Sequence, residues 1–167
     1  MLKQDMVNLP IFEGLDPEAL NWIEPMLDLC TFAKDDRIFN QGQPATFLYI
    51  VVSGEVNVRF KPYDGPELSV ARILPGGVFG WSAALGHNAY TSSAVAVEFC
   101  EAARIHGDQL HRLCQERPEI GVVVLERLAG VIAERLRSTY SQILSILTKG
   151  MDLKHTSNRR IEPHERQ

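Results

Sequence analysis

The sequence predicts a mainly β protein with flanking helices, in which an antiparallel sandwich or jelly roll is followed by a short helix and a long C-terminal helix. Between residues 31 and 104, short runs of β-branched and aromatic residues alternate with turns rich in glycine, proline and aspartate. Before and after this stretch, apolar residues recur every three or four positions, which is typical of helices.

The first helical signal lies within residues 9–28, and the helix is expected to start at residues 15–18. Asp16 is expected to cap it, because its carboxylate can accept a hydrogen bond from a free backbone N–H, and Pro17 suits the first helical position. Pro25 should kink or end this helix because it lacks an N–H donor. Its apolar face consists of Leu20, Ile23 and Leu27.

Regular turns divide the middle of the chain into short strands, and this spacing predicts the sandwich. The alternation of polar and apolar residues in 55–60 is typical of a half-buried strand. The predicted strands are residues 37–40, 47–52, 55–60, 68–74, 94–99 and 101–105.

Residues 74–94 predict a tight turn, a short strand, one turn of helix and a second strand rich in hydroxyl groups. A helix start aims free N–H groups at one point and favours negative charge there. The segment therefore predicts a phosphate-type pocket, or what remains of one. His87, at the tip of this segment, is either an anion contact or a solvated loop residue.

A short helix is expected over residues 109–117, and a long one from Pro118 to about 148. The long helix would extend roughly 45 Å. Its apolar stripe continues past the end of the sandwich, which favours pairing with a second copy over folding back along its own domain. The stripe consists of Val124, Leu125, Leu128, Ile132, Leu136, Ile143 and Leu147.

These elements predict one domain over residues 1–148, with a barrel at about 28–105 and the long helix at about 118–148. Residues 149–167 are polar and are expected to be disordered.

Composition excludes several functions. The 167 residues are 45% apolar and carry a net charge of −4, without the basic excess that nucleic-acid binding needs. The sequence contains no membrane-spanning run and no signal peptide, so we expect a cytoplasmic protein with no membrane partner. Cys30, Cys100 and Cys114 lie far apart, so buried thiols are expected, with no metal and no cofactor. No catalytic motif is present, and we expect that the protein is not an enzyme.

Three motifs carry a resemblance to a known family. Residues 41–45 resemble the first glycine turn of cyclic nucleotide-binding domains, residues 48–56 their central hairpin, and residues 74–80 the entry to their phosphate-binding cassette. The family is typified by the catabolite activator protein, and the resemblance implies a double-stranded β-helix with a dimerising helix. About 20 residues after that helix are too few for a winged-helix domain, so direct DNA binding is not expected.

The resemblance also implies where a ligand would bind. In the family, a glutamate after the Phe-Gly pair binds the ribose and an arginine ten residues later binds the cyclic phosphate. Here these positions hold Trp81 and Thr91, while amides near Ser82 and neighbouring hydroxyls remain to hold a cyclic nucleotide or another small anion. The implied ligand-binding residues are Phe79, Gly80, Trp81, Ser82, Ala83, Ala84, Tyr90, Thr91, Ser92 and Ser93.

Several residues have two interpretations. Trp81 and Tyr90 either fill the vacated pocket or enclose a flat ligand. Ser138, Thr139 and Tyr140 lie where the family's helix reaches the base, or are polar positions of a helix pair. Arg135 and Arg137 either form a solvated face or supply the missing cation.

Two functions follow from the sequence. The first is a stand-alone regulatory or sensory module that binds a non-standard ligand, or a cyclic nucleotide only weakly. The alternative is a ligand-free module that acts in dimerisation or protein docking.

Overall fold

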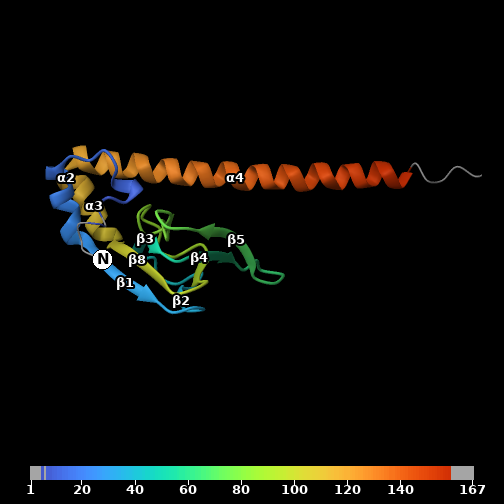
Figure 1. Ribbon diagram of the computed structural model, residues 1–167, viewed down its shortest axis with the longest axis horizontal. Helices are drawn as coiled ribbons and strands as arrows, with labels where there is room; N and C mark the ends of the chain where they lie inside the picture. Colours follow the sequence, from blue (N-terminus) through green and yellow to red (C-terminus); the bar gives the residue numbers. More distant parts are fainter. Residues whose placement is uncertain (1–4, 6, 159–167) are drawn as a thin grey trace, which may run out of the picture. The chain divides into compact units, whose positions relative to one another are not determined.

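The computed structural model describes residue 5 and residues 7–158 (Figure 1). Contacts divide the chain into two units, residues 1–128 and a second unit that begins at Ala129 within the long helix. The elements are η1 (Pro10–Phe12), α2 (Pro17–Ile23), η2 (Glu24–Met26), β1 (Leu27–Phe32), β2 (Arg37–Phe39), β3 (Phe47–Ser53), β4 (Val56–Phe60), β5 (Leu68–Ile73), β6 (Val78–Phe79), β7 (Ser93–Ala96), β8 (Cys100–His106), α3 (Gly107–Glu116) and α4 (Pro118–Asn158).

The strands form two four-stranded sheets, in the orders β1-β8-β3-β6 and β2-β7-β4-β5. The paired strands are antiparallel throughout these two sheets. The predicted sandwich is thus confirmed over residues 27–106. The two sheets remain separate, so the barrel expected at 28–105 is not closed.

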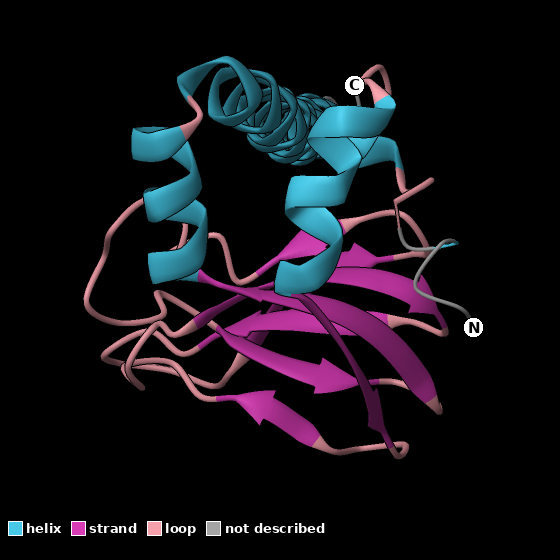
Figure 2. Cartoon of the chain, turned by 90° about the vertical axis from the view of Figure 1, so that its left-hand side faces the viewer, coloured by secondary structure: helices cyan, strands magenta, loops and turns pink. Residues whose placement is uncertain are grey.

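The core lies between the inner faces of the two sheets. Because side chains alternate along a strand, Tyr49 and Val51 of β3 point inward and meet Val56 and Val58 of β4 in one buried cluster. Leu48 and Ile50 point to the opposite face of β3 and are also buried. Helices lie over one side of the strands in Figure 2, which accounts for this second buried face.

The N-terminal helix begins as predicted. The backbone N–H of Ala19 donates to Asp16 Oδ1 at 2.7 Å, and Pro17 is the first residue of α2. α2 ends at Ile23 and passes into a 3₁₀ turn that contains Pro25. The prediction of a helix up to residue 28 was wrong by two residues, since Leu27 already begins β1 and is buried there.

Gly54 makes the turn between β3 and β4. Its φ is +80°, and a Cβ there would lie 2.4 Å from the carbonyl oxygen of Phe99. Only glycine combines this conformation with so close an approach of two backbone segments. The predicted turn at this position is confirmed.

The C-terminal helices are longer than predicted. α3 starts at Gly107 rather than at residue 109, and α4 continues to Asn158. Residues 149–158, for which a disordered tail is expected, continue α4 and contain no proline to end the helix. Residues 159–167 lie outside the described residues. In the described part of the chain, no helix is long and apolar enough to cross a membrane.

Candidate functional site

The candidate site is the segment of residues 79–93, the cassette, which connects β6 to β7. β6 pairs with β3, so that Phe79 lies opposite Tyr49. Gly80 follows with a φ of +72°, and a Cβ there would lie 2.9 Å from the carbonyl oxygen of Phe47. A side chain at this position would therefore push the cassette away from the end of β3.

The cassette contains the predicted single turn of helix. The N–H of Leu85 donates to the carbonyl of Trp81 at 3.0 Å, and the N–H of His87 donates to that of Ser82 at 3.0 Å. Gly86 has a φ of +73°, which together with the bond from His87 forms a Schellman-type helix end. The backbone of His87 thus closes the turn, while its side chain is exposed.

The helical turn is tightly packed on α3. His111 Nε2 lies 2.8 Å from the carbonyl oxygen of Ala84, and because a carbonyl only accepts, Nε2 donates. A Cβ on Gly107 would lie 2.5 Å from the carbonyl oxygen of Ala83. His106 caps the same helix, since the N–H of Asp108 donates to its Nδ1 at 3.2 Å.

Tyr90 lies inside the sandwich rather than over its surface. Its ring is stacked on Phe39 with centroids 3.7 Å apart and planes inclined by 14°. Its side chain is only 4% exposed. Burial raises the pKa of the Tyr90 hydroxyl, so it is neutral at physiological pH.

The hydroxyl of Tyr90 completes a backbone ladder. The N–H of Phe47 donates to it at 2.9 Å, and it donates to the carbonyl of Phe47 at 2.8 Å. The backbone N–H and carbonyl of Val51 bond to the segment that leads into β6. Along an antiparallel strand, backbone groups point to alternate neighbours, so those of Phe47, four residues earlier, point to the same side of β3 as those of Val51. β6 has ended at Phe79, and the tyrosine hydroxyl takes the place of a paired residue.

The hydroxyl-rich end of the cassette is used unequally. Ser93 is buried, and its Oγ accepts from the N–H of Gln41 at 2.9 Å. Ser92 is half-buried and Thr91 is exposed. Ser82 is buried and Trp81 is half-buried at the start of the helical turn. Thr91, at the position that binds phosphate in the family, is therefore exposed, whereas Trp81, at the position that binds ribose, is half-buried.

The structure brings the ten implied ligand-binding residues into one segment but gives many of them structural roles. Residues 79–93 contain no lysine or arginine, so the cassette supplies no fixed cation. Eight of the ten are engaged in packing or in hydrogen bonds within the fold, namely Phe79, Gly80, Trp81, Ser82, Ala83, Ala84, Tyr90 and Ser93.

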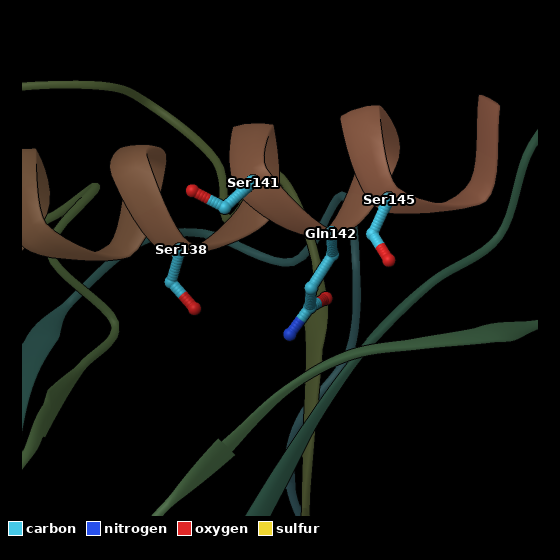
Figure 3. Close-up of a pocket in the computed structure, with 4 residues that line it drawn as sticks. All are labelled: Ser138, Ser141, Gln142 and Ser145. Carbon is cyan, nitrogen blue, oxygen red and sulfur yellow. The ribbon is translucent and has the colours of Figure 1, made fainter. Parts of the chain in front are cut away.

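The polar residues of α4 lie on separate sides of the helix. Ser138, Ser141, Gln142 and Ser145 line a shallow pocket and share one face of the helix (Figure 3). Thr139 Oγ1 donates to the carbonyl of Arg135 one turn earlier, and Arg137 pairs with Glu134 on the same helix. Tyr140 is 65% exposed.

The cysteines and potential metal ligands form no reactive centre among the residues that the structure describes. Burial raises the pKa of Cys30, Cys100 and Cys114, which keeps these thiols protonated. No group of three or more His, Cys, Asp or Glu side chains in the described segments could hold a metal ion.

The two open sheets and the helical turn between β6 and β7 define a jelly-roll domain with a cassette insertion. The family of cyclic nucleotide-binding domains matches residues 29–117 of the chain. The chain belongs to this family and has the cyclic nucleotide-binding fold.

Its relatives are regulators. A CRP-like cAMP-activated global transcriptional regulator of Mycobacterium tuberculosis is 30% identical over 137 residues, 82% of this chain and 59% of the relative. The cyclic AMP receptor protein of Thermus thermophilus is 31% identical over 79% of this chain and 59% of that protein. This chain thus spans less than two thirds of the length of these curated relatives.

Solved structures agree with the fold. The catabolite activator protein of Thermus thermophilus superposes with a TM-score of 0.67 at 30% identity, over 83% of this chain and 63% of that one. A cyclic nucleotide-binding domain from Methylobacillus flagellatus reaches a TM-score of 0.75 at 22% identity, over 85% of this chain and 80% of that one. At that identity the second likeness concerns the fold alone.

Proposed function

We propose that this chain is a non-catalytic regulatory module whose cassette binds a non-standard ligand, or a cyclic nucleotide only weakly. The observation that carries the proposal is the pair Trp81 and Thr91, which occupy the glutamate and arginine positions of the family. Neither can make the ionic contacts that the family uses. The cassette offers backbone amides, the hydroxyls of Thr91 and Ser92, and the indole of Trp81.

The loss of the arginine can be expressed as affinity. A charge-assisted hydrogen bond to phosphate contributes roughly 1.5–3 kcal/mol, which corresponds to about one to two powers of ten in Kd. Loss of the ribose acceptor at position 81 adds to this. A ligand without a phosphate charge is less affected by the loss of the arginine, and a ligand without a ribose hydroxyl by the loss of the glutamate.

A thermal-unfolding titration with cyclic AMP, cyclic GMP and a cyclic dinucleotide tests this function. The parent is compared with the double variant Trp81→Glu, Thr91→Arg. A ligand at one hundred times its Kd stabilises by about 2.7 kcal/mol, or roughly 5–11 °C for a chain of this size. The control, Trp81→Glu with Thr91→Gln, adds a long side chain without the positive charge.

We expect the double variant to respond to a cyclic nucleotide, while the control and the parent respond weakly or not at all. A parent response as large as that of the double variant would contradict the proposal, because the family's ionic contacts would then be dispensable. A silent double variant would favour the second candidate function.

The second candidate is a ligand-free module that acts in dimerisation or docking. The observation that favours it is the position of Tyr90, which stacks on Phe39 at 3.7 Å inside the sandwich and has both hydrogen-bonding functions of its hydroxyl engaged. The aromatic ring of this cassette residue already lies inside the sandwich, where a flat ligand would compete with it.

We further propose that the module forms a homodimer through α4. Ile120, Val124 and Leu128 of α4 are buried within the first unit. At 100° per residue, a second apolar stripe lies about 130° around the helix from them. This stripe is exposed and consists of Val122, Leu125, Leu136, Tyr140 and Leu147.

A charge in the stripe tests the dimer. Leu136→Glu should produce monomers by light scattering after size-exclusion chromatography, because an unpaired charge in an apolar seam is costly to bury. The control Gln142→Glu places the same charge on the polar face of Figure 3 and should leave the dimer intact. A monomeric parent would refute the dimer without affecting the ligand proposal.

A further inference from the structure

Arg104 projects from β8 onto the inner face of the first sheet. In the strand register it lies between Asp28 of β1 and Tyr49 of β3, so the three side chains form one row on the same face. Its guanidinium carbon lies 4.2 Å from the centroid of the Phe47 ring. A cation held flat on an aromatic face presents its N–H edge sideways.

That edge contains an unsatisfied donor. Across the side chains that the structure describes, Nε of Arg104 is the one buried nitrogen or oxygen atom without a hydrogen-bond partner. The nearest acid oxygen, Oδ2 of Asp28, lies 3.9 Å away, beyond hydrogen-bond reach. The Asp28 side chain is 69% exposed, so water competes for it. A buried donor of this kind calls for an acceptor.

The other polar groups near Arg104 are protonated. Burial raises the pKa of Cys30, Tyr49 and Tyr90, and the positive charge of Arg104 acts against this shift in all three. The Cys30 thiol donates to the carbonyl of Ala102 at 3.2 Å. The hydroxyl of Tyr49 accepts a hydrogen bond from Arg104. Because these neighbours are neutral groups, they do not neutralise the charge of the arginine.

We propose that Arg104, supported by the ring of Phe47, forms a second binding site for a small oxyanion, namely a phosphate or carboxylate group. The planar donors of an arginine match the two oxygens of such a group. Arg104 belongs to β8 and not to the cassette, although Phe47 contacts Arg104 through its ring and the cassette residue Tyr90 through its backbone. The carboxylate of Asp28 competes weakly with the incoming anion for the donors of Arg104.

Side-chain NMR of the ¹⁵N-labelled chain tests this site. Potassium phosphate, and in a second series potassium acetate, replaces chloride at constant ionic strength while the Arg104 Nε–H signal is followed. We expect a saturable shift of this signal. A shift with phosphate alone assigns the site to phosphate groups and a shift with acetate alone to carboxylates; no saturable shift with either overturns the proposal.

Two variants define the contacts, with affinity read from the backbone amide signals of β1 and β8. Arg104→Lys keeps the charge but removes the Nε donor and the planar edge, and should weaken anion binding by about tenfold or more. Asp28→Asn removes the competing carboxylate and should tighten binding by about two- to fivefold.

Equal affinity in the parent and in Arg104→Lys would overturn the proposal. Should Arg104→Lys fail to fold, Asp28→Asn decides: tighter binding supports the site, and unchanged or weaker binding overturns it. The cassette does not enter these measurements, so their failure leaves the proposed function intact.

Discussion

Removal of one oxygen atom from Tyr90 should destabilise the domain. In Tyr90→Phe the ring remains stacked on Phe39, but the backbone N–H and carbonyl of Phe47 lose the partner that completes the β3 ladder. The new side chain fills the same space and cannot replace either bond. The loss is therefore confined to hydrogen bonding, without a large cavity.

The magnitude follows from the two orphaned groups. A buried donor or acceptor left without a partner costs about 1–3 kcal/mol. Phe47 is half-buried, so water satisfies its backbone in part, and we expect a decrease of about 2–4 kcal/mol in the free energy of unfolding. This corresponds to a Tm lower by about 4–16 °C.

Urea denaturation measures the free energy, and hydrogen exchange measures the Phe47 amide directly. The control Tyr140→Phe removes a hydroxyl from a side chain that is 65% exposed and should stay within about 0.5 kcal/mol of the parent. If Tyr90→Phe also stayed within that range and the Phe47 amide exchanged no faster, the tyrosine hydroxyl would not be holding the end of β3.

Three further perturbations have expected signs. Gly121→Ala should lower the free energy of unfolding by about 1–3 kcal/mol, because its Cβ would lie 2.7 Å from Cα of Cys114. Gly130→Ala on the same helix has open space and should raise the free energy of unfolding by up to about 1 kcal/mol. A hydrogen bond from Arg37 lowers the pKa of Glu67 from its ordinary value of 4.5. The ion pair therefore stabilises the fold above pH 4.5, and this contribution is lost as the pH falls through the lower pKa of the folded state. Glu67→Gln should reduce the loss of stability in acid denaturation. Burial raises the pKa of Cys100 to about 11, so iodoacetamide should modify it slowly in the native protein and rapidly in urea.

Each expectation has a contrary outcome. Equal stability of the two glycine variants would show that α3 and α4 can separate at no cost. If the parent and Glu67→Gln lost the same stability between pH 5 and 3, the ion pair of Glu67 would not contribute to the acid response. Fast alkylation of Cys100 in the native state would mean that β8 opens readily.

Local signals predicted most of the fold. Asp16 and Pro17 begin α2, and Gly54 ends β3, because caps and left-handed turns depend on neighbouring residues only. The helical spacing of Leu27 from Ile23 predicts that Leu27 lies in the helix, although Pro25 intervenes. There the pairing of β1 with β8, nearly eighty residues away, decided the structure over local periodicity.

The order of motifs predicted the position of the cassette but not the use of its side chains. Tyr90 bonds to Phe47, and His111 bonds to the carbonyl of Ala84, across 43 and 27 residues respectively. No pattern of neighbouring residues encodes such contacts. The sequence does not single out Arg104 for the same reason, since an arginine in a short strand normally lies in water and only the strand register places it on the inner face.

The close packing of the cassette on α3 has a kinetic consequence. With Gly107 against the carbonyl of Ala83, and His111 bonded to that of Ala84, neither segment can open while the other stays in place. Amide protons of the cassette turn and of α3 should therefore exchange with solvent as one cooperative unit. A ligand that stabilises the cassette turn will therefore also slow the opening of α3, even if the ligand itself does not contact α3.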